Sequence, residues 1–176
     1  MRTNIALIGF MGTGKSAVGC ALAQKLGRDF VEMDSLTENM AGKSIREIFQ
    51  QDGEITFREM EIEVTKKIAR KTGQVIACGG GMVLNKINTD RLRETSRMVY
   101  LTASPRKILE RTSDGKNERP LLDVPDPAQR IREMLDFRKP FYQRSADITI
   151  DTSRLSIDKV ADMIISRLKE DEGFNL

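Results

Sequence analysis

The stretch Gly9-Phe10-Met11-Gly12-Thr13-Gly14-Lys15-Ser16 decides the fold, because it matches the phosphate-loop pattern G-x-x-x-x-G-K-S/T at every fixed position. An aliphatic run from Ile5 to Ile8 precedes it, as is typical of a buried parallel strand. Val18, Leu22 and Leu26 follow at a spacing of four and predict a helix over 16–26 that ends at Gly27. The pattern therefore lies between the strand and the helix that a phosphate loop requires.

The residues of this stretch suit the chemistry of a nucleoside triphosphate. Glycines at 9, 12 and 14 let the backbone curl so that its N–H groups point at phosphate oxygens, and the following helix adds its positive end. Lys15 supplies charge to the β and γ phosphates, and the Ser16 hydroxyl is a ligand for Mg²⁺. The alternative is a glycine-rich turn with an incidental Gly-Lys-Ser. Even a phosphate loop does not identify the molecule that accepts the phosphoryl group. The predicted ATP-binding residues here are Gly12, Thr13, Gly14, Lys15, Ser16 and Ala17.

Short apolar runs alternate with longer helical patterns along the rest of the chain. This alternation predicts an α/β sandwich with a mostly parallel sheet, and 176 residues suit a single domain. The tail from Glu172 to Leu176 is expected to be disordered. We expect strands at 30–31, 75–77, 98–101 and 148–150, and helices at 44–71 with a break at Asp52-Gly53, 85–94, 104–111, 125–143 and 157–168.

The composition excludes several classes of site and partner. The chain has no histidine, so a Ser-His-Asp or Cys-His site, a His-ligated zinc and a histidine general base are all excluded. The 29 Lys and Arg residues against 26 Asp and Glu give a net charge of +3, which indicates neither nucleic acid nor a membrane surface as partner. No stretch approaches the roughly 18 apolar residues of a membrane span. Cys20 and Cys78 have apolar neighbours, and we expect buried free thiols in a reducing cytoplasm.

Two carboxylates stand at alternate positions where the second strand ends, in Phe30-Val31-Glu32-Met33-Asp34. Alternate residues of a strand point to the same side, and α/β folds bind ligands at the carboxyl ends of their strands. One carboxylate could reach Mg²⁺ through water, and the other could accept a proton from an acceptor hydroxyl. The alternative is a solvated strand end with Asp34 as a helix N-cap.

Two further motifs favour an acceptor site. Arg58 and Glu61 lie at i and i+3 of an expected helix and share a face, although an ordinary surface ion pair is the simpler interpretation. Gly79-Gly80-Gly81 follows the third strand directly, and three successive glycines indicate a ligand lying against bare backbone more than a turn.

Two arginines lie in distinctive surroundings. The polar stretch from Thr112 to Glu118 has the composition of a mobile loop. A mobile loop over about 112–124 could act as a lid that closes over ATP and brings Arg119 to the transferring phosphoryl group. The alternative is an ordinary surface loop. Arg138 lies late in a helix, where a cation is stabilising in any case.

Taken together and in this order, the motifs resemble those of the shikimate kinases over about residues 3–165. The resemblance implies a P-loop NTPase three-layer sandwich, similar to nucleoside-monophosphate kinases, with a five-stranded parallel sheet and a substrate-binding segment at about 34–62. It also implies ATP-dependent phosphorylation of the 3-hydroxyl of shikimate, in the chorismate route to aromatic amino acids. A chain of this size is expected to be a monomer. The resemblance is carried by residues 9–16, Val18-Gly19, Leu22-Ala23, Asp34, Phe57-Arg58 to Glu61, Gly79-Gly80-Gly81, Arg119-Pro120-Leu121-Leu122 and Arg138 to Tyr142.

Carried over position by position, the resemblance also assigns roles. It implies that Lys15, Asp34 and Arg119 are catalytic, that Arg111 lies against adenine, and that the loop Asp151-Thr152-Ser153-Arg154 completes the adenine site. Two arginines can clamp the carboxylate of shikimate through bidentate hydrogen bonds. The residues implied to hold shikimate are Asp34, Arg58, Gly80 and Arg138, supported by Glu61, Gly79 and Gly81.

Glu32 departs from the family pattern, which usually has aspartate as an outer-shell partner of Mg²⁺. Glutamate keeps the charge but adds a methylene, so a contact through water could survive while direct geometry shifts by about an ångström. Two other functions stay open: a related kinase that phosphorylates gluconate, a nucleotide or another polyol, and a regulatory P-loop module without kinase activity. A GTPase is disfavoured, since the chain has no N-K-x-D motif.

Overall fold

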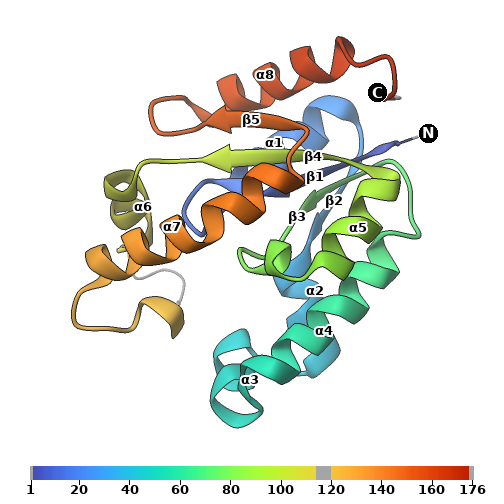
Figure 1. The fold of residues 1–176 in the computed structure, drawn as a ribbon. Coiled ribbons are helices and arrows are strands. Elements are labelled where there is room, and N and C mark those ends of the chain that lie inside the picture. Colours follow the sequence, from blue (N-terminus) through green and yellow to red (C-terminus); the bar gives the residue numbers. More distant parts are fainter. Residues whose placement is uncertain (1, 114–119, 175–176) are drawn as a thin grey trace.

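A computed structural model describes residues 2–113 and 120–174 of the chain. Within these ranges a sheet of five strands has the order β2-β3-β1-β4-β5, and every neighbouring pair is parallel. Figure 1 shows this sheet across the middle of the molecule, with helices on both sides. The predicted α/β fold with a parallel sheet is confirmed. The strands are β1 Asn4–Ile8, β2 Asp29–Glu32, β3 Gln74–Ala77, β4 Ser96–Thr102 and β5 Ile148–Asp151.

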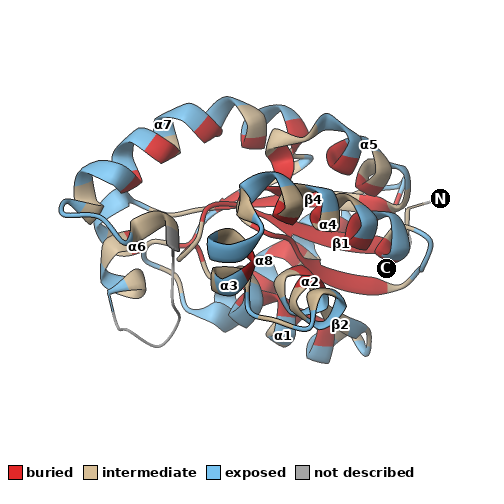
Figure 2. Cartoon of the chain, turned by 90° about the horizontal axis from the view of Figure 1, so that it is seen from below, coloured by how far each residue is buried: buried red, intermediate tan, exposed pale blue. Residues whose placement is uncertain are grey.

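Alternate strand residues pack against opposite helical layers, because successive side chains of a strand point to opposite faces. In β1, Ile5 and Leu7 join a core cluster with α1 and α8, whereas Ala6 and Ile8 join a cluster with α4, α5 and α7. Figure 2 shows the buried strands between helices that are exposed on their outer sides. The helices are α1 Lys15–Leu26, α2 Met33–Ala41, α3 Ile45–Gln51, α4 Gly53–Ile68, α5 Lys86–Thr95, α6 Pro105–Thr112, α7 Pro127–Ser145 and α8 Ile157–Lys169, with 3-10 turns η1 Met82–Leu84 and η2 Pro120–Leu122.

The sheet brings three loops of the predicted site to one edge. Carboxyl ends of parallel strands meet at the same edge, where α/β folds bind their ligands. The phosphate loop follows β1, Glu32 ends β2, and the triple glycine comes directly after β3 and Cys78. These strands are neighbours in the order β2-β3-β1, so the motifs of residues 9–16, 32–34 and 79–81 lie side by side.

The observed helix boundaries agree with the predicted ones in most places, and the main difference is at the end of β2. The predicted break at Asp52-Gly53 is confirmed, since α3 ends at Gln51 and α4 begins at Gly53. The extension of the second strand to Asp34 is wrong. The chain passes from β2 straight into α2, so Asp34 lies in the first turn of a helix and makes no side-chain cap. Helix α2 corresponds to the alternative in which a helix starts at Asp34, but its N-cap is Glu32 and not Asp34.

Two other expectations are wrong. Cys20 is exposed on α1, and only Cys78 of the two thiols is buried. The tail packs against the chain in its described part, since Phe174 is 8% exposed and its ring lies 5.4 Å from the Arg28 guanidinium carbon, whereas residues 175–176 lie outside the described residues. Within the described ranges, no helix is long and apolar enough to span a membrane.

Candidate active site

The phosphate loop between β1 and α1 is curled by its glycines. Gly9, Gly12 and Gly14 have φ values of 146°, 77° and 94°, a range that residues with side chains rarely adopt. Gly14 is the N-cap of α1, so the positive end of that helix lies at the loop. The Thr13 hydroxyl closes the loop by donating to the Phe10 carbonyl at 2.8 Å. The predicted curled, helix-capped loop is confirmed.

Lys15 lies folded over this loop. Its Nζ donates to the carbonyl oxygens of Gly9 at 2.9 Å and Phe10 at 3.0 Å. These neutral carbonyl groups orient the ammonium group without cancelling its charge, so the charge stays at the place where a phosphate group would need it.

Ser16 and Glu32 meet at the mouth of the loop. The pKa of Glu32 is raised overall, chiefly by burial and also by the charge of Asp34. A hydrogen bond from Ser16 and the charge of Lys15 act in the opposite direction and lower it. The hydroxyl and the carboxylate are both hard oxygen ligands of the kind that Mg²⁺ prefers. No group of three acidic or thiol side chains able to hold a metal occurs among the described residues. The donor set therefore fits a Mg²⁺ ion that takes its other ligands from water and from phosphates.

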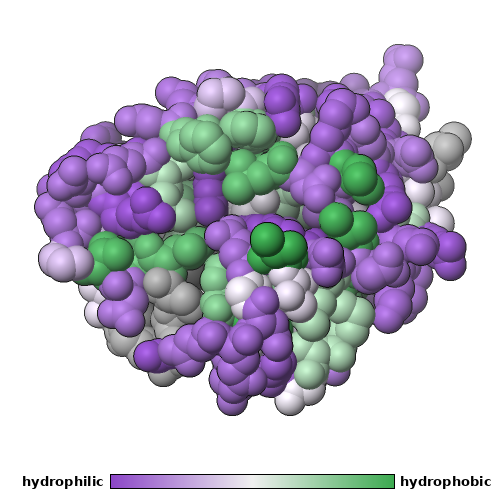
Figure 3. All heavy atoms as spheres, turned by 60° about the horizontal axis from the view of Figure 1, so that its bottom comes forward, coloured by the Kyte–Doolittle hydropathy of each residue, from purple (hydrophilic) through white to green (hydrophobic). Residues whose placement is uncertain are grey.

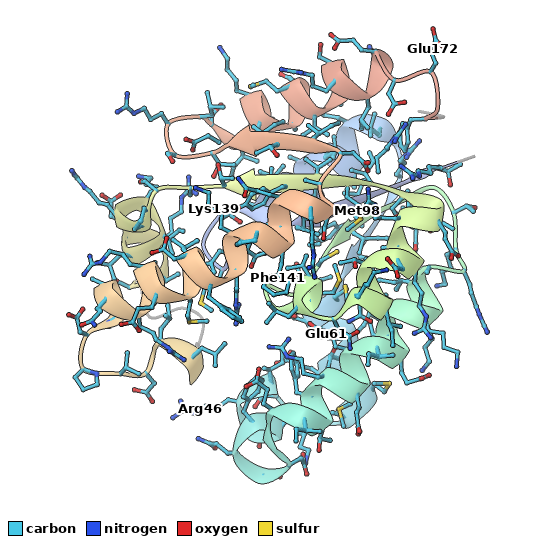
Figure 4. The ribbon with its side chains drawn as sticks, in the orientation of Figure 1. Arg46, Glu61, Met98, Lys139, Phe141 and Glu172 are labelled. Carbon is cyan, nitrogen blue, oxygen red and sulfur yellow. The ribbon has the colours of Figure 1, made fainter. Side chains whose placement is uncertain are left out.

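Asp34 and Glu61 converge on Gly79. Glu61 projects from α4 (Figure 4), is 2% exposed, and its Oε1 has no hydrogen-bond partner among the described residues. A Cβ atom placed on Gly79 would lie 2.7 Å from Glu61 Oε1 and 3.0 Å from Asp34 Oδ1. Burial raises the pKa of Glu61, and this outweighs the opposite effect of the Arg58 guanidinium.

Arg58 lies between two carboxylates of its own helix. Its Nη1 donates to Glu61 Oε2 at 3.0 Å, and its Nη2 donates to Glu54 Oε1 at 3.0 Å. Burial lowers the pKa of Arg58, but the charges of Glu61 and Glu54 raise it overall. The predicted shared face is confirmed, and the interpretation as a surface pair is wrong because Glu61 is buried.

Arg138 reaches the same region from α7. It is 5% exposed, its Nη1 donates to the Gly80 carbonyl at 3.4 Å, and its guanidinium carbon lies 5.7 Å from the Phe10 ring centre. Helix α7 continues to Ser145, so Arg138 is not in the last turn. A favourable contact with the helix dipole therefore does not explain this buried cation.

A cavity of about 660 Å³ unites these groups. Figure 3, with the bottom of the molecule turned forward, shows patches of apolar side chains among hydrophilic ones on this face. The structure thus places the phosphate loop and the acceptor motifs on one cavity. The predicted site residues that line it are Gly12, Gly14, Lys15, Ser16, Ala17, Glu32, Asp34, Arg58, Glu61, Gly79, Gly80, Gly81, Arg111 and Arg138.

Of the predicted site residues that the structure describes, Thr13 and Arg154 do not line this cavity. Thr13 is 1% exposed, and its hydroxyl donates a hydrogen bond within the phosphate loop. Arg154 is exposed, in the loop after β5. Arg119 lies outside the described residues, as does the middle of the predicted lid.

Arg111 joins the phosphate loop to the loop after β5. It donates to the Gly12 carbonyl at 3.0 Å and to the Thr152 carbonyl at 2.9 Å, and the Thr152 hydroxyl donates to the Thr13 carbonyl at 2.8 Å. The predicted neighbours of an adenine site are therefore adjacent.

Helix α3 lies within the expected substrate-binding segment of about 34–62, but none of its residues was predicted for the site. Ile45, Arg46 and Phe49 line the cavity, and the rings of Phe49 and Phe57 lie 4.9 Å apart. Arg46 projects from α3 in Figure 4. Apolar residues of a short helix are typical of a core, so only their position between Asp34 and Arg58 in the sequence could have pointed to the site.

Comparisons with known proteins agree with this geometry. A family model described as shikimate kinase matches residues 11–169. A shikimate kinase of Caldanaerobacter subterraneus subsp. tengcongensis is 48% identical over 162 residues, which cover 92% of this chain and 94% of that protein. A shikimate kinase of Symbiobacterium thermophilum is 44% identical over 168 residues, which cover 95% and 97%.

A solved structure gives the same result. Shikimate kinase from Acinetobacter baumannii, in complex with shikimate, matches with a TM-score of 0.93 and 35% identity over 98% of this chain and 96% of that one. The family model spans most of the chain, and these relatives match over nearly their whole length, as the motifs predicted. The chain belongs to the shikimate kinase family.

Proposed function

We propose that this cavity transfers the γ-phosphoryl group of ATP to the 3-hydroxyl of shikimate, the reaction of the chain's family, with the residues and Mg²⁺ site set out below. The observation that carries the assignment is that one cavity is lined by the phosphate loop, by the arginines Arg58 and Arg138, and by the carboxylates Asp34 and Glu61. Shikimate is a small carboxylated triol, and the arginines suit its carboxylate while a carboxylate suits its hydroxyls.

On the donor side, Lys15 and the N–H groups at the start of α1 hold the β and γ phosphates. Ser16 would hold Mg²⁺ and Glu32 would hold it through water, and the ion when bound would neutralise charge on the phosphates. Glu32 replaces the usual aspartate, and its contact with Ser16 supports a water-mediated role. Arg111 and the loop after β5 border adenine. The role of Arg119 on the phosphates remains a prediction.

On the acceptor side, Arg58 and Arg138 clamp the carboxylate of shikimate, and the Gly80 backbone adds a contact. Asp34 orients the 3-hydroxyl and accepts its proton. The 3-oxygen then bonds to the γ-phosphorus as the bond from that phosphorus to the β,γ-bridging oxygen breaks, and ADP leaves. Glu61 supports this arrangement by holding Arg58 in place.

The assignment of Asp34 is tested by the substitution Asp34→Asn. Loss of a positioned base costs about 10²- to 10⁴-fold in rate, so we expect kcat to fall by at least 10²-fold. The Kd of ATP, measured by calorimetry, should change less than about twofold, because the phosphate loop is intact. Asp29→Asn, at the exposed start of β2, is the matched control and should keep its activity. Full turnover by the Asp34→Asn variant would remove Asp34 from the mechanism.

Two properties of the whole protein belong to the same proposal. One chain supplies both sides of the cavity, which supports a monomer. The free thiols Cys20 and Cys78 suit a reducing compartment, which supports the cytoplasm.

A further inference from the structure

We infer that Tyr142 is a positioning residue of the acceptor site, whose hydroxyl fixes the Gly80–Gly81 peptide and the Arg138 guanidinium for the carboxylate of the substrate. This inference rests on the proposed function, because it gives Tyr142 an effect on acceptor binding. It concerns a residue that lies outside the cavity lining.

Tyr142 and Arg138 both donate a hydrogen bond to the Gly80 carbonyl. Tyr142 and Arg138 lie at i and i+4 of α7 and share a face of that helix. The Tyr142 hydroxyl donates to the Gly80 carbonyl oxygen, and the Arg138 guanidinium acts on the Tyr142 phenol through its charge. Arg138 Nη1 also donates to the Gly80 carbonyl, at 3.4 Å. The two side chains therefore restrain the Gly80 carbonyl together, and Arg138 and Tyr142 are linked through it.

Fixing the Gly80 carbonyl also fixes the next amide. A trans peptide is planar, so its N–H points opposite to its C=O, and the structure has no cis peptide in its described part. With the Gly80 carbonyl turned toward α7, the Gly81 N–H points away from that helix. The amides of residues 79–81 donate no hydrogen bond to any other described residue, so they are available to an oxygen of the substrate.

The triple glycine needs such a restraint from outside. Glycine has no side chain to limit its backbone, so a run of three can rotate its peptides at little cost. A Cβ at Gly80 would make only ordinary contacts, with Met11 N at 3.5 Å and Gly9 O at 3.7 Å, so packing does not hold this residue tightly. The bond from Tyr142 supplies the missing restraint.

Tyr142 is itself held firmly. It is fully buried, and its ring stacks on Tyr100 with centres 4.9 Å apart and planes 16° apart. Burial raises the pKa of the Tyr142 phenol, so the hydroxyl stays protonated and remains a donor at any pH at which the enzyme is assayed. A rigid, protonated phenol is the form that a positioning residue requires.

The variant Tyr142→Phe removes the hydroxyl and keeps the ring stack. We expect the KM and the calorimetric Kd of shikimate to rise about five- to tenfold, the effect of one hydrogen bond. The KM of ATP and kcat should change less than about twofold. Tyr100→Phe is the matched control, because the Tyr100 hydroxyl donates no hydrogen bond to another described residue and its loss should leave all of these constants unchanged.

KM and Kd do not depend on how much enzyme is folded, so a loss of stability cannot imitate this result. Unchanged shikimate constants in Tyr142→Phe, or an equal rise in Tyr100→Phe, would overturn the inference. Combining Tyr142→Phe with Arg138→Lys tests the route, because residues that act through one group have non-additive effects on the Kd of shikimate. Additive effects would contradict action through Arg138. If the wild-type enzyme fails to phosphorylate shikimate, the proposed function fails, whereas an active wild type with an unaffected Tyr142→Phe variant rejects only this inference.

Discussion

At the scale of single residues, the outer glycines of the triple glycine make room for charged side chains of the chain itself. A Cβ at Gly79 would meet the Glu61 carboxylate, and a Cβ at Gly81 would lie 2.5 Å from both Nη atoms of Arg58. None of the three glycines needs a positive φ. The sequence predicted a ligand against bare backbone, and the structure shows that two of the three positions leave room for Glu61 and Arg58 against that backbone.

The substitution Gly81→Ala tests this role. The new methyl group must displace the Arg58 guanidinium, so we expect kcat/KM for shikimate to fall at least about tenfold, chiefly through KM. Gly80→Ala adds the same methyl group where the nearest atom is 3.5 Å away, and its effect on kcat/KM should be smaller. Steady-state kinetics of both variants measure the difference. A larger fall in kcat/KM for Gly80→Ala than for Gly81→Ala would show that Gly81 does not act by leaving space for the Arg58 side chain.

Glu61 also makes a prediction about stability and pH. Its pKa is raised above its ordinary value of 4.5 by burial, so the folded protein binds this proton more tightly than the unfolded chain does. The free energy of unfolding therefore falls as pH rises from about 4.5 to the raised value, and this loss persists at higher pH.

The variant Glu61→Gln lacks this titration. Its free energy of unfolding in urea, relative to the wild type, should increase as pH rises through that window. Glu63→Gln, an exposed carboxylate on the same helix, is the control. A difference between wild type and Glu61→Gln that stays constant with pH would contradict the burial argument.

At the scale of elements, the sequence located the helices that have clear ends and missed the one without a clear beginning. The core strands and α1 could be predicted because apolar spacing and flanking glycines mark them. Helix α2 follows β2 without a turn, so Asp34 was predicted to end a strand, although its approach to the site was predicted correctly. Helix α3 was predicted, but nothing in its spacing says that Ile45 and Phe49 face a cavity.

Helix α3 is held by a capping box that affects the site only through the helix. Ser44 caps α3, and Glu47 closes the box by accepting from the Ser44 amide at 2.8 Å. Glu47 is exposed and does not line the cavity. Because α3 carries Ile45, Arg46 and Phe49, Glu47→Ala should raise the KM of shikimate about two- to fivefold.

The matched control removes a cap far from the cavity. Ser156 caps α8 by accepting from the Lys159 amide, and Ser156→Ala should cost about 1 kcal/mol of stability without changing the KM of shikimate. Equal KM values for shikimate in Glu47→Ala and the wild type would show that the capping box of α3 does not affect acceptor binding.

At the scale of the whole molecule, the parallel sheet explains why scattered motifs make one site. The sequence predicts a strand before each of the three motifs, and a parallel sheet then places all of them at one edge. Contacts between segments far apart could not be predicted, because no local pattern encodes them. An example is the contact of Tyr142 with Gly80, which depends on how α7 packs on the sheet. The proximity of Arg111 and Thr152 was implied only by the family resemblance.

The central claim is that this cavity phosphorylates shikimate, and ADP release by the wild-type enzyme tests it most directly. ADP is measured with ATP and Mg²⁺ and, in separate assays, shikimate, quinate, gluconate or AMP, and ³¹P NMR locates the phosphate on the product. We predict ADP release with shikimate alone, in amounts equal to the shikimate 3-phosphate formed. Release with another acceptor in preference to shikimate, or ATP binding without release in any assay, would contradict the account.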